Sequence, residues 1–533
     1  MSKLKTIGIV IIPVGLLNSS CVKKLSGKED VKPNIVYIMT DDHSFQTISA
    51  YGHPISKLAP TPNIDRLADE GILFQQAFVE NSLSTPSRAC LMTGLYSHQN
   101  GQRQLGKGID STKTFFSELL QQGGYQTAVV GKWHMQCEPK GFDYYKILWD
   151  QGEYYNPGFR SKESEGKYIK EEGYASTLIT DNSLRFLDQR DKDKPFCLLI
   201  HHKAPHRNWM PDTKYLDLYE DVEFPMPDTF YDDYATRCSP ASTQEMTISK
   251  TMNMIYDLKV LELKDIPPYD KEWNISDLEY MLDRMTPAQR EAWHKAYGPK
   301  NEELVKQNLQ GDELVKWKFQ RYLKDYLRCI KSIDDEVGRV LDYLEKEGLK
   351  ENTIIVYTSD QGFYMGEHGW FDKRFMYEES FRTPLIMRYP KMIKAGSKTD
   401  ALVQNIDYAP TFLSLASIEK PKQMSGTSLE PLFSGDKPDN WRTSLYYHYY
   451  DYPAVHNVRR HDGVRTDRYK LIHFYGEGMM RNDMDIDCNE LYDLQTDPHE
   501  LNNLYGKDGY QEITNELQAV LDKYRSDLKV DEY

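Results

Sequence analysis

The sequence predicts an α/β protein, in which helices cover both faces of an open, mostly parallel sheet, followed by a smaller C-terminal α+β domain. From Lys32 onward, short apolar runs alternate with stretches of helical periodicity. The runs carry apolar residues on both faces, as strands buried on both sides do. Beyond residue 435 the runs become short and closely spaced, which is typical of an antiparallel sheet.

Each element of the main sheet follows from its own pattern. The predicted strands cover 34–40, 127–130, 195–200, 353–358 and 384–387, and all are interpreted as buried strands of the parallel type. Helices are predicted over 61–71, which ends in glycine, and over 311–348, where apolar residues recur at helical spacing. The stretch 208–312 shows no strand pattern, and we interpret it as a cap near the active face or as peripheral decoration.

The C-terminal part begins after a turn-rich linker at 434–440. Short strands are predicted over 444–450, 463–466, 469–474 and 490–493, and a helix over 511–528. We therefore predict an N-terminal catalytic domain at 32–435 and an α+β subdomain with an antiparallel sheet at 436–533.

The first 21 residues predict a signal peptide. Lys3 and Lys5 precede an apolar run over 7–17, which is too short to span a bilayer as a helix. Small residues then precede Cys21, an arrangement similar to a bacterial lipoprotein signal with Cys21 lipidated. Asn18 fits that signal poorly, so a plain secretory cleavage stays an alternative, and an uncleaved N-terminus is the least favoured reading.

Composition excludes several classes of protein. With 39% hydrophobic and 28% charged residues the chain is expected to be globular rather than disordered. A net charge of −15 argues against a nucleic-acid partner, because nothing would neutralise a phosphate backbone. The seven cysteines form no C-x-x-C pair, so neither a thiolate zinc site nor a dense disulfide framework is expected.

Polar clusters follow four of the five predicted strands. Since the carboxyl ends of parallel strands meet at one edge of a sheet, we expect these clusters to form one site. Their members are Asp41, Asp42 and His43; Lys132 and His134; His201, His202 and His206; and Asp360 and Gln361.

A fifth polar element is the segment Ser84-Thr-Pro-Ser-Arg88. Pro86 suits the first turn of a helix, and Ser84 is expected just before that helix, where the backbone N–H groups and the dipole favour an anion. Arg88 points back toward the same end. For an isolated Ser-x-Pro, an N-cap is the better interpretation.

These motifs together resemble the formylglycine-dependent sulfatases. Ser84-x-Pro86-x-Arg88, continued by Leu91-Met-Thr-Gly94, is similar to the signature of that family. The similarity extends in order along nearly all of the chain after the signal, through Thr40-Asp-Asp42, Gly131-Lys-Trp-His134, Ala204-Pro-His206, Thr358-Ser-Asp360 and Asp372-Lys373. It implies an alkaline-phosphatase-like fold and hydrolysis of sulfate esters on carbohydrates.

The resemblance also implies the cofactors. Ser84 would be oxidised to formylglycine by an anaerobic sulfatase-maturating enzyme, which points to a Gram-negative anaerobe with the protein in the periplasm or on the outer membrane, held only by its lipid anchor. One calcium ion would bind Ser84 and four further residues, Asp41, Asp42, Asp360 and Gln361. Gln361 stands where the family usually has Asn, and its longer arm must be accommodated.

The family's catalytic roles carry over residue by residue. Arg88 would orient the nucleophile, and Lys132 and Lys373 would bind sulfate oxygens. His134 would act as the base that lets the sulfated intermediate collapse, and His206 would protonate the leaving sugar oxygen. For His201 and His202 we favour a structural role.

The stretches 201–209, 360–380 and 459–465 are most similar to bacterial N-acetylglucosamine-6-sulfatases, which implies exo-acting 6-O-desulfation of N-acetylglucosamine-6-sulfate in glycosaminoglycan or mucin glycans. His456, Arg459, Arg460 and His461 are candidates for the sugar pocket, or else form a solvated basic turn. A sulfatase for another sugar position, a phosphatase or phosphodiesterase of the same superfamily, and a non-catalytic glycan-binding lipoprotein remain as alternatives.

Overall fold

The computed structural model describes residues 31–480 and 483–533, so the predicted signal peptide and Cys21 lie outside the described residues. Residues from Lys32 to Tyr533 group into one compact unit. The predicted boundary between residues 435 and 436 stays a prediction. Within the described ranges, no helix is both long and apolar enough to cross a bilayer.

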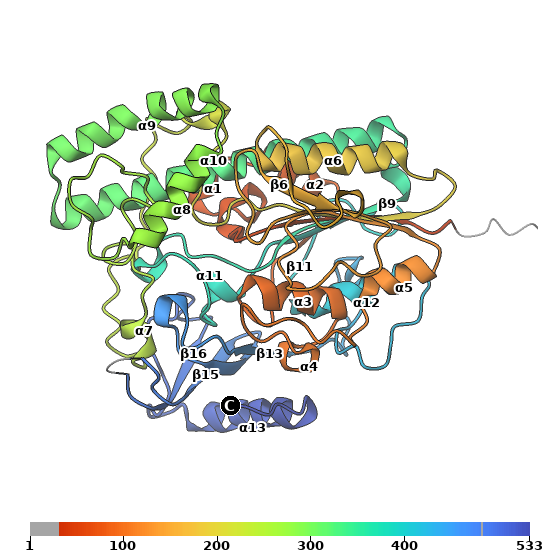
Figure 1. Ribbon diagram of the computed structural model, residues 1–533. Coiled ribbons are helices and arrows are strands. Elements are labelled where there is room, and N and C mark those ends of the chain that lie inside the picture. The colour runs from red at the N-terminus through yellow and green to blue at the C-terminus, as the bar shows by residue number, and fades with distance from the viewer. Residues whose placement is uncertain (1–30, 481–482) are drawn as a thin grey trace, which may run out of the picture. The chain divides into compact units, whose positions relative to one another are not determined.

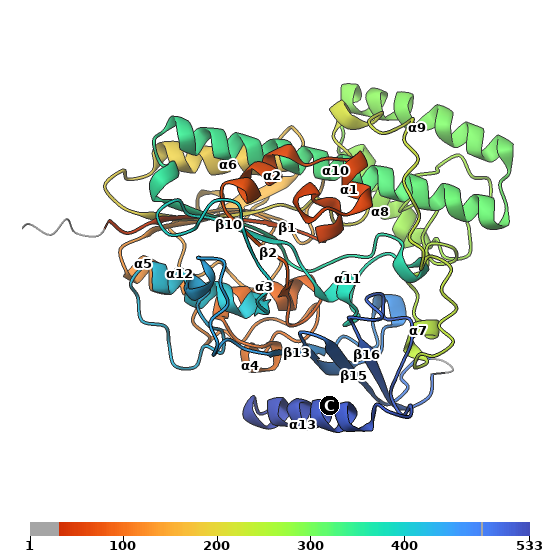
Figure 2. The same cartoon turned by 180° about the vertical axis from the view of Figure 1, so that it is seen from behind.

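The main sheet has ten strands (Figures 1 and 2). In spatial order they are β11 (Ser397–Thr399), β2 (Ile72–Phe74), β10 (Leu385–Arg388), β9 (Thr353–Ser359), β1 (Asn34–Thr40), β8 (Phe196–His201), β4 (Gln126–Gly131), β5 (Tyr144–Leu148), β6 (Gly158–Ser161) and β7 (Ile169–Lys170). The central strands from β9 to β5 are parallel, which confirms the predicted fold class.

The prediction that residues 384–387 form a parallel strand is wrong in direction. β10 forms as expected but pairs antiparallel with both β9 and β2. The loop after β9 carries Asp360 and Lys373 and returns through α11 (Glu378–Phe381) to the same edge of the sheet. Because β10 starts at the edge where β9 ends, it must run back through the sheet, and its apolar sequence gives no sign of this.

Both faces of the sheet are buried. Along β1, Val36 and Ile38 enter one apolar core, while Ile35, Tyr37 and Met39 enter the other. The helices α2 (Pro62–Asp69), α6 (Ala175–Gln189) and α10 (Gly311–Lys346) cover the first face, and α3 (Ser84–Thr93), α5 (Phe116–Gln122) and α12 (Tyr408–Leu415) cover the second (Figures 1 and 2).

The C-terminal elements form a second, antiparallel sheet. Its order is β13 (Ser444–Tyr449), β14 (His461–Thr466), β15 (Tyr469–Gly476) and β16 (Ile486–Asp493). The helix α13 (Gln511–Asp527) buries Leu517 and Leu521 against Tyr446, Val464 and Leu471 of this sheet. The predicted C-terminal α+β element is therefore present.

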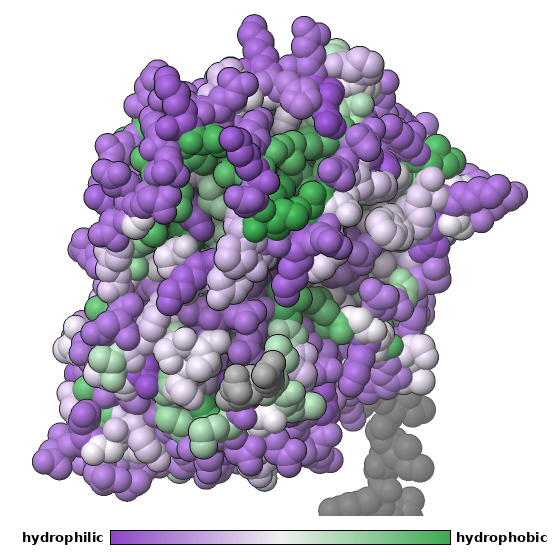
Figure 3. All heavy atoms as spheres, turned by 60° about the vertical axis from the view of Figure 1, so that its left-hand side comes forward, coloured by the Kyte–Doolittle hydropathy of each residue, from purple (hydrophilic) through white to green (hydrophobic). Residues whose placement is uncertain are grey.

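The stretch 208–312 combines helices with long irregular segments. It contains α7 (Pro240–Thr243), α8 (Glu272–Asp283) and α9 (Pro287–Gln307), and no strand lies between residues 208 and 312. Figure 3 brings forward the side that carries α7, α8 and α9, where hydrophobic side chains gather in a hollow bounded by hydrophilic ones. The smaller elements elsewhere are α1 (Pro54–Leu58), α4 (Ser97–Asn100), and the pair β3 (Ala77–Phe78) and β12 (Val403–Gln404).

A disulfide between Cys238 and Cys488 ties this stretch to β16, with 6.1 Å between the Cα atoms. The two cysteines are 250 residues apart, so their spacing in the sequence gives no sign of the pairing. Cys90, Cys197 and Cys329 are free and buried, as expected of small apolar residues.

Candidate active site

The polar clusters lie at the carboxyl ends of four strands that are neighbours in the sheet, β9, β1, β8 and β4. The backbone N–H of Asp42, after β1, donates to Oδ1 of Asp360, after β9, at 3.1 Å. Lys132, after β4, reaches the carboxylate of Asp41. Parallel pairing thus brings residues more than 300 positions apart in the sequence into one buried site.

Ser84 joins this site from the opening residue of α3. Its Oγ donates to Oδ1 of Asp41 at 3.0 Å and accepts from Nε2 of Gln361 at 3.3 Å. The N-cap of the helix is Leu83, whose side chain makes no capping bond. The interpretation of Ser84 as an N-cap is therefore wrong, because its hydroxyl faces the carboxylates instead.

Arg88, one turn further along α3, connects the residues that follow β9 with those that follow β4. Its Nε and Nη2 donate to Oδ2 of Asp360 at 3.2 and 3.1 Å, and its Nη1 donates to the carbonyl of Lys132 at 3.0 Å. The guanidinium is completely buried. A buried charge with this many partners is fixed in place, so Arg88 sets where the nearby groups can lie.

Three carboxylates share the interior of the site. Burial, reinforced by the charge of Asp41, raises the pKa of Asp42 to about 6 and that of Asp360 to about 7. Burial also acts on Asp41, but the charges of Lys132 and Arg88 hold its pKa well below the ordinary value. The site therefore concentrates negative charge that protein cations only partly balance.

Two lysines pair with the carboxylates of the site. Nζ of Lys373 lies 2.7 Å from Oδ2 of Asp42. Nζ of Lys132 pairs with Asp41 and donates to Oε1 of Gln151 at 2.5 Å. Burial lowers the pKa of Lys132, whereas Asp42 and Asp372 outweigh burial and raise the pKa of Lys373.

Two histidines border the same space. Nε2 of His206 lies 3.8 Å from Oδ2 of Asp42, and Nδ1 of His134 lies 3.3 Å from Oγ1 of Thr85. Burial lowers the pKa of both rings well below the ordinary value, so both are neutral at pH 7. Nδ1 of His206 lies 2.7 Å from the carbonyl of Arg207, which only accepts, so this nitrogen carries the proton.

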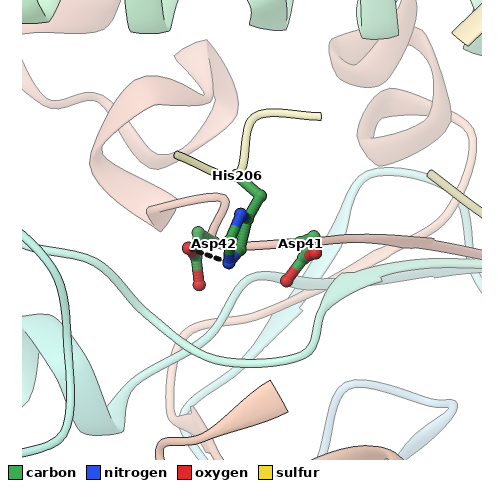
Figure 4. A group of neighbouring side chains, drawn as sticks. All are labelled: Asp41, Asp42 and His206. Atoms are coloured by element: carbon green, nitrogen blue, oxygen red, sulfur yellow. Dashed lines mark ion pairs between the residues drawn. The ribbon is translucent and has the colours of Figure 1, made fainter. Parts of the chain in front are cut away.

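The donor set fits a hard divalent cation. One ligand atom from each of Asp41, Asp42 and His206 lies within 4.8 Å of the other two. Figure 4 shows these three side chains gathered at one place. Oε1 of Gln361 is buried and has no hydrogen-bond partner among the described residues. An oxygen left without a partner beside three carboxylates is the environment that oxygen-binding cations prefer.

His201 and His202 are fully buried beneath this space. Nδ1 of His201 lies 3.2 Å from the carbonyl of Lys132, and burial lowers the pKa of both rings. The structure gives neither of them a contact with the carboxylates, in agreement with the structural role that we favoured.

Of the four sugar-pocket candidates, the structure brings only His456 to the site. Nε2 of His456 lies 3.2 Å from Oδ2 of Asp372, the residue before Lys373. Arg459 donates to the carbonyls of Gly476 and Met484, and Arg460 to those of Tyr450 and Tyr452. His461 is buried among aromatic rings of the C-terminal sheet.

Sequence reasoning missed two groups beside the site. The Arg374 guanidinium donates to Asp372 and to the hydroxyl of Tyr449, each at 3.2 Å. Arg207, next to His206, forms a two-pronged ion pair with Asp257 of the helical stretch, at 2.6 and 2.8 Å. That stretch therefore reaches the active face, which agrees with its interpretation as a cap; Asp257 lies in no motif that could have revealed it.

The chain belongs to the sulfatase family: residues 33–418 match the family described as Sulfatase. Residues 366–527 also match the C-terminal part of N-sulphoglucosamine sulphohydrolase. A fold likeness extends to phosphonate monoester hydrolase of Agrobacterium radiobacter, with a TM-score of 0.63 at 19% identity.

Individual relatives are similar over nearly the whole length. An N-acetylglucosamine-6-O-sulfatase of Bacteroides thetaiotaomicron is 45% identical over 98% of this chain and 91% of its own. Human N-acetylglucosamine-6-sulfatase is 27% identical over 78% of this chain and 67% of its own. The solved structure of BT4656 with its substrate D-glucosamine-2-N,6-O-disulfate has a TM-score of 0.87 and 46% identity, covering 94% of this chain and 99% of that one.

Proposed function

We propose that this sulfatase removes the 6-O-sulfate from N-acetylglucosamine-6-sulfate at the non-reducing end of glycosaminoglycan or mucin glycans. The 45% identity to an N-acetylglucosamine-6-O-sulfatase supports the substrate. The hydrogen bond of 3.0 Å from Ser84 to Asp41, inside a shell of buried cations, is the observation that carries the chemistry. It puts a hydroxyl where an anionic ester meets Arg88, Lys132 and Lys373.

We propose further that Ser84 is converted to formylglycine by an anaerobic sulfatase-maturating enzyme. Once hydrated, this aldehyde would supply one hydroxyl for attack at sulfur and a second whose deprotonation allows sulfate to leave. The buried position of Ser84 and its bonds to Asp41 and Gln361 support the proposal, because they would fix a hydrated side chain in one orientation. The Ser84 peptide of active enzyme should be lighter by two hydrogens in mass spectrometry; an active enzyme with unmodified Ser84 would refute this.

Four further residues of the chain have separate roles in the proposed reaction. Lys132 and Lys373 bind sulfate oxygens and stabilise the charge that grows on them. His134, neutral and unprotonated at Nε2, takes up a proton. His206 donates a proton from Nε2 to the leaving sugar oxygen. Nε2 must first be protonated, and the carboxylate of Asp42 at 3.8 Å favours that protonation.

One calcium ion is the cation that we propose for the site, held by Asp41, Asp42, Asp360 and Oε1 of Gln361. When bound, it would offset the charge of the carboxylates and polarise a sulfate oxygen. The placement of Nε2 of His206 within reach of Asp41 and Asp42 also allows a zinc site, which would favour phosphate esters. Turnover of sulfate and phosphate esters of the same phenol, with calcium and with zinc, separates the two: zinc-dependent phosphate hydrolysis without sulfate hydrolysis would overturn the proposal.

We also propose that the protein is exported and lipidated at Cys21. The Cys238–Cys488 disulfide supports export, since such bonds persist in oxidising compartments. Labelled fatty acid should be incorporated by the natural protein and not by Cys21→Ala; a soluble, unlabelled natural protein would favour plain secretory cleavage.

A further inference from the structure

A cavity of about 550 Å³ opens beside the active site, at the end of β5. His134 is one of the residues that line it. The other lining residues that matter here are Glu138, Trp149, Asp150, Arg160 and Tyr168. None of these five was singled out by the sequence motifs, and none has a role in the chemistry proposed above.

The walls of the cavity have the composition of a carbohydrate site. Trp149 is 53% exposed and Tyr168 is 40% exposed, although large aromatic side chains are usually buried. The Arg160 guanidinium lies 5.7 Å from the ring centre of Tyr168 and 5.8 Å from that of Tyr145. Its Nη1 is 2.9 Å from the carboxylate of Glu138. Aromatic rings pack against the C–H faces of a sugar, while an oriented guanidinium and carboxylate pair with its hydroxyls.

The loop that carries Trp149 also contacts the reaction centre. Oδ1 of Asp150 lies 3.5 Å from Nε2 of His134. The next residue, Gln151, contacts both His134 and Lys132 through its side-chain amide. A sugar resting on Trp149 is therefore one short loop away from the groups that handle the sulfate, as expected for the neighbour of the sulfated sugar.

The charges that line the cavity favour some neighbouring sugars over others. Glu138 and Asp150 are acidic, Arg160 is the one basic lining residue, and His134 is neutral. Arg160 is already paired with Glu138, so Asp150 leaves an excess negative charge. Such a surface accepts hydrogen bonds from hydroxyls but repels a carboxylate or a second sulfate.

We propose that this cavity binds a neutral, hydroxyl-bearing monosaccharide on the reducing side of the N-acetylglucosamine-6-sulfate unit. This inference rests on the proposed function and narrows it, because it favours glycans in which the sulfated sugar is followed by a neutral hexose over those in which a uronic acid follows.

The test compares three substrates: N-acetylglucosamine-6-sulfate alone, the same sugar linked to a neutral hexose, and the same sugar linked to a uronic acid. Stacking on Trp149 should raise kcat/KM for the neutral disaccharide about tenfold over the monosaccharide. The uronic acid should give no gain. Trp149→Ala should abolish the gain and leave kcat/KM for the monosaccharide within about twofold. Trp273→Ala, which removes an even more exposed tryptophan of α8, should change none of the three rates.

The three-substrate comparison separates a failure of the proposed function from a failure of the cavity assignment. Absence of turnover on all three substrates would refute the proposed function itself. Turnover of the monosaccharide with equal rates on both disaccharides, or with a preference for the uronic acid, would refute the cavity assignment and leave the function standing. Tyr168→Ala repeats the comparison at the second exposed aromatic residue of the cavity, so a folding defect in one variant does not leave the result open. Glu138→Gln should relax the discrimination against the uronic acid.

Discussion

The side-chain amide of Gln151 joins two residues of the active site, Lys132 and His134. Its Oε1 accepts from Nζ of Lys132 at 2.5 Å, which fixes the orientation of the amide. Its Nε2 must then be the donor toward Nε2 of His134, at 3.2 Å. Gln151 thereby keeps the lone pair of that nitrogen free of a proton, which is the form that a base needs.

Gln151→Ala should lower kcat about fivefold and change KM by less than about twofold, since one neutral hydrogen bond contributes about 1 kcal/mol. Water admitted to the space should raise the pKa of His134 from its lowered value, so the acidic limb of the kcat profile should move to higher pH. Steady-state kinetics between pH 5 and 9 measure both effects. Gln189→Ala, on an exposed position of α6, is the matched control, and an unchanged acidic limb would show that Gln151 does not position His134.

Removal of the cation should affect stability as well as rate. Chelation should lower the thermal midpoint and the activity together, because a ligand that binds only the folded state stabilises it. Calcium should restore both, and Asp360→Asn should weaken the response to calcium. A midpoint that is insensitive to chelator in natural protein would argue against a cation among these carboxylates.

The Cys238–Cys488 disulfide should matter for stability and not for chemistry. Replacing both cysteines by serine should lower the free energy of unfolding by about 2–4 kcal/mol, with kcat unchanged. Denaturant unfolding measures the loss. Cys137→Ser, at a free and half-buried cysteine, should leave stability nearly unchanged; equal losses in the two variants would contradict the pairing.

A buried ion cluster away from the active site should make stability depend on acidic pH. Asp325 lies 2.9 Å from both Lys259 and Arg328. Burial opposes ionisation, but these cations outweigh it and lower the pKa of Asp325 to about 2. Because the folded pKa lies below the unfolded value of about 3.9, the stabilisation is complete above pH 5 and is lost as the pH falls from 4 to 2.

Asp325→Asn should therefore destabilise the protein at pH 7 by about 3 kcal/mol. The difference from natural protein should shrink by about 2 kcal/mol on going from pH 5 to pH 2. Urea unfolding at several pH values gives the comparison; a difference independent of pH would mean that Asp325 acts through packing rather than charge.

The central part of the fold could be predicted because its causes are local. β1 covers the predicted residues 34–40, since a run with apolar residues on both faces is explained by burial of both faces. The acidic pair after it, and Lys132 after β4, follow from the rule that parallel strands end at one edge. The direction of β10 and the Cys238–Cys488 pairing depend on contacts between distant segments, which a single sequence does not encode locally.

The candidate site likewise contains residues that the sequence could predict and residues that it could not. Ser84, Arg88 and the carboxylates lie in motifs of fixed spacing, and the structure brings them together. Gln151, Trp149 and Asp257 lie in segments without a motif and reach the site through the path of their loops. Arg459 and Arg460 have the composition of a binding site, yet both donate to backbone carbonyls nearby, and Arg460 also pairs with Glu532. Charge in a sequence does not distinguish these uses.

The central claim is that an oxidised Ser84 desulfates N-acetylglucosamine-6-sulfate. It is tested most directly by sulfate release from that sugar, using protein produced with and without a serine-type maturating enzyme, and using Ser84→Ala produced with it. We predict rapid release only for natural protein with the maturating enzyme, and a rate at least about a thousandfold lower in the other two. Equal release by Ser84→Ala, or none by natural protein whose Ser84 is shown to be oxidised, would contradict the account.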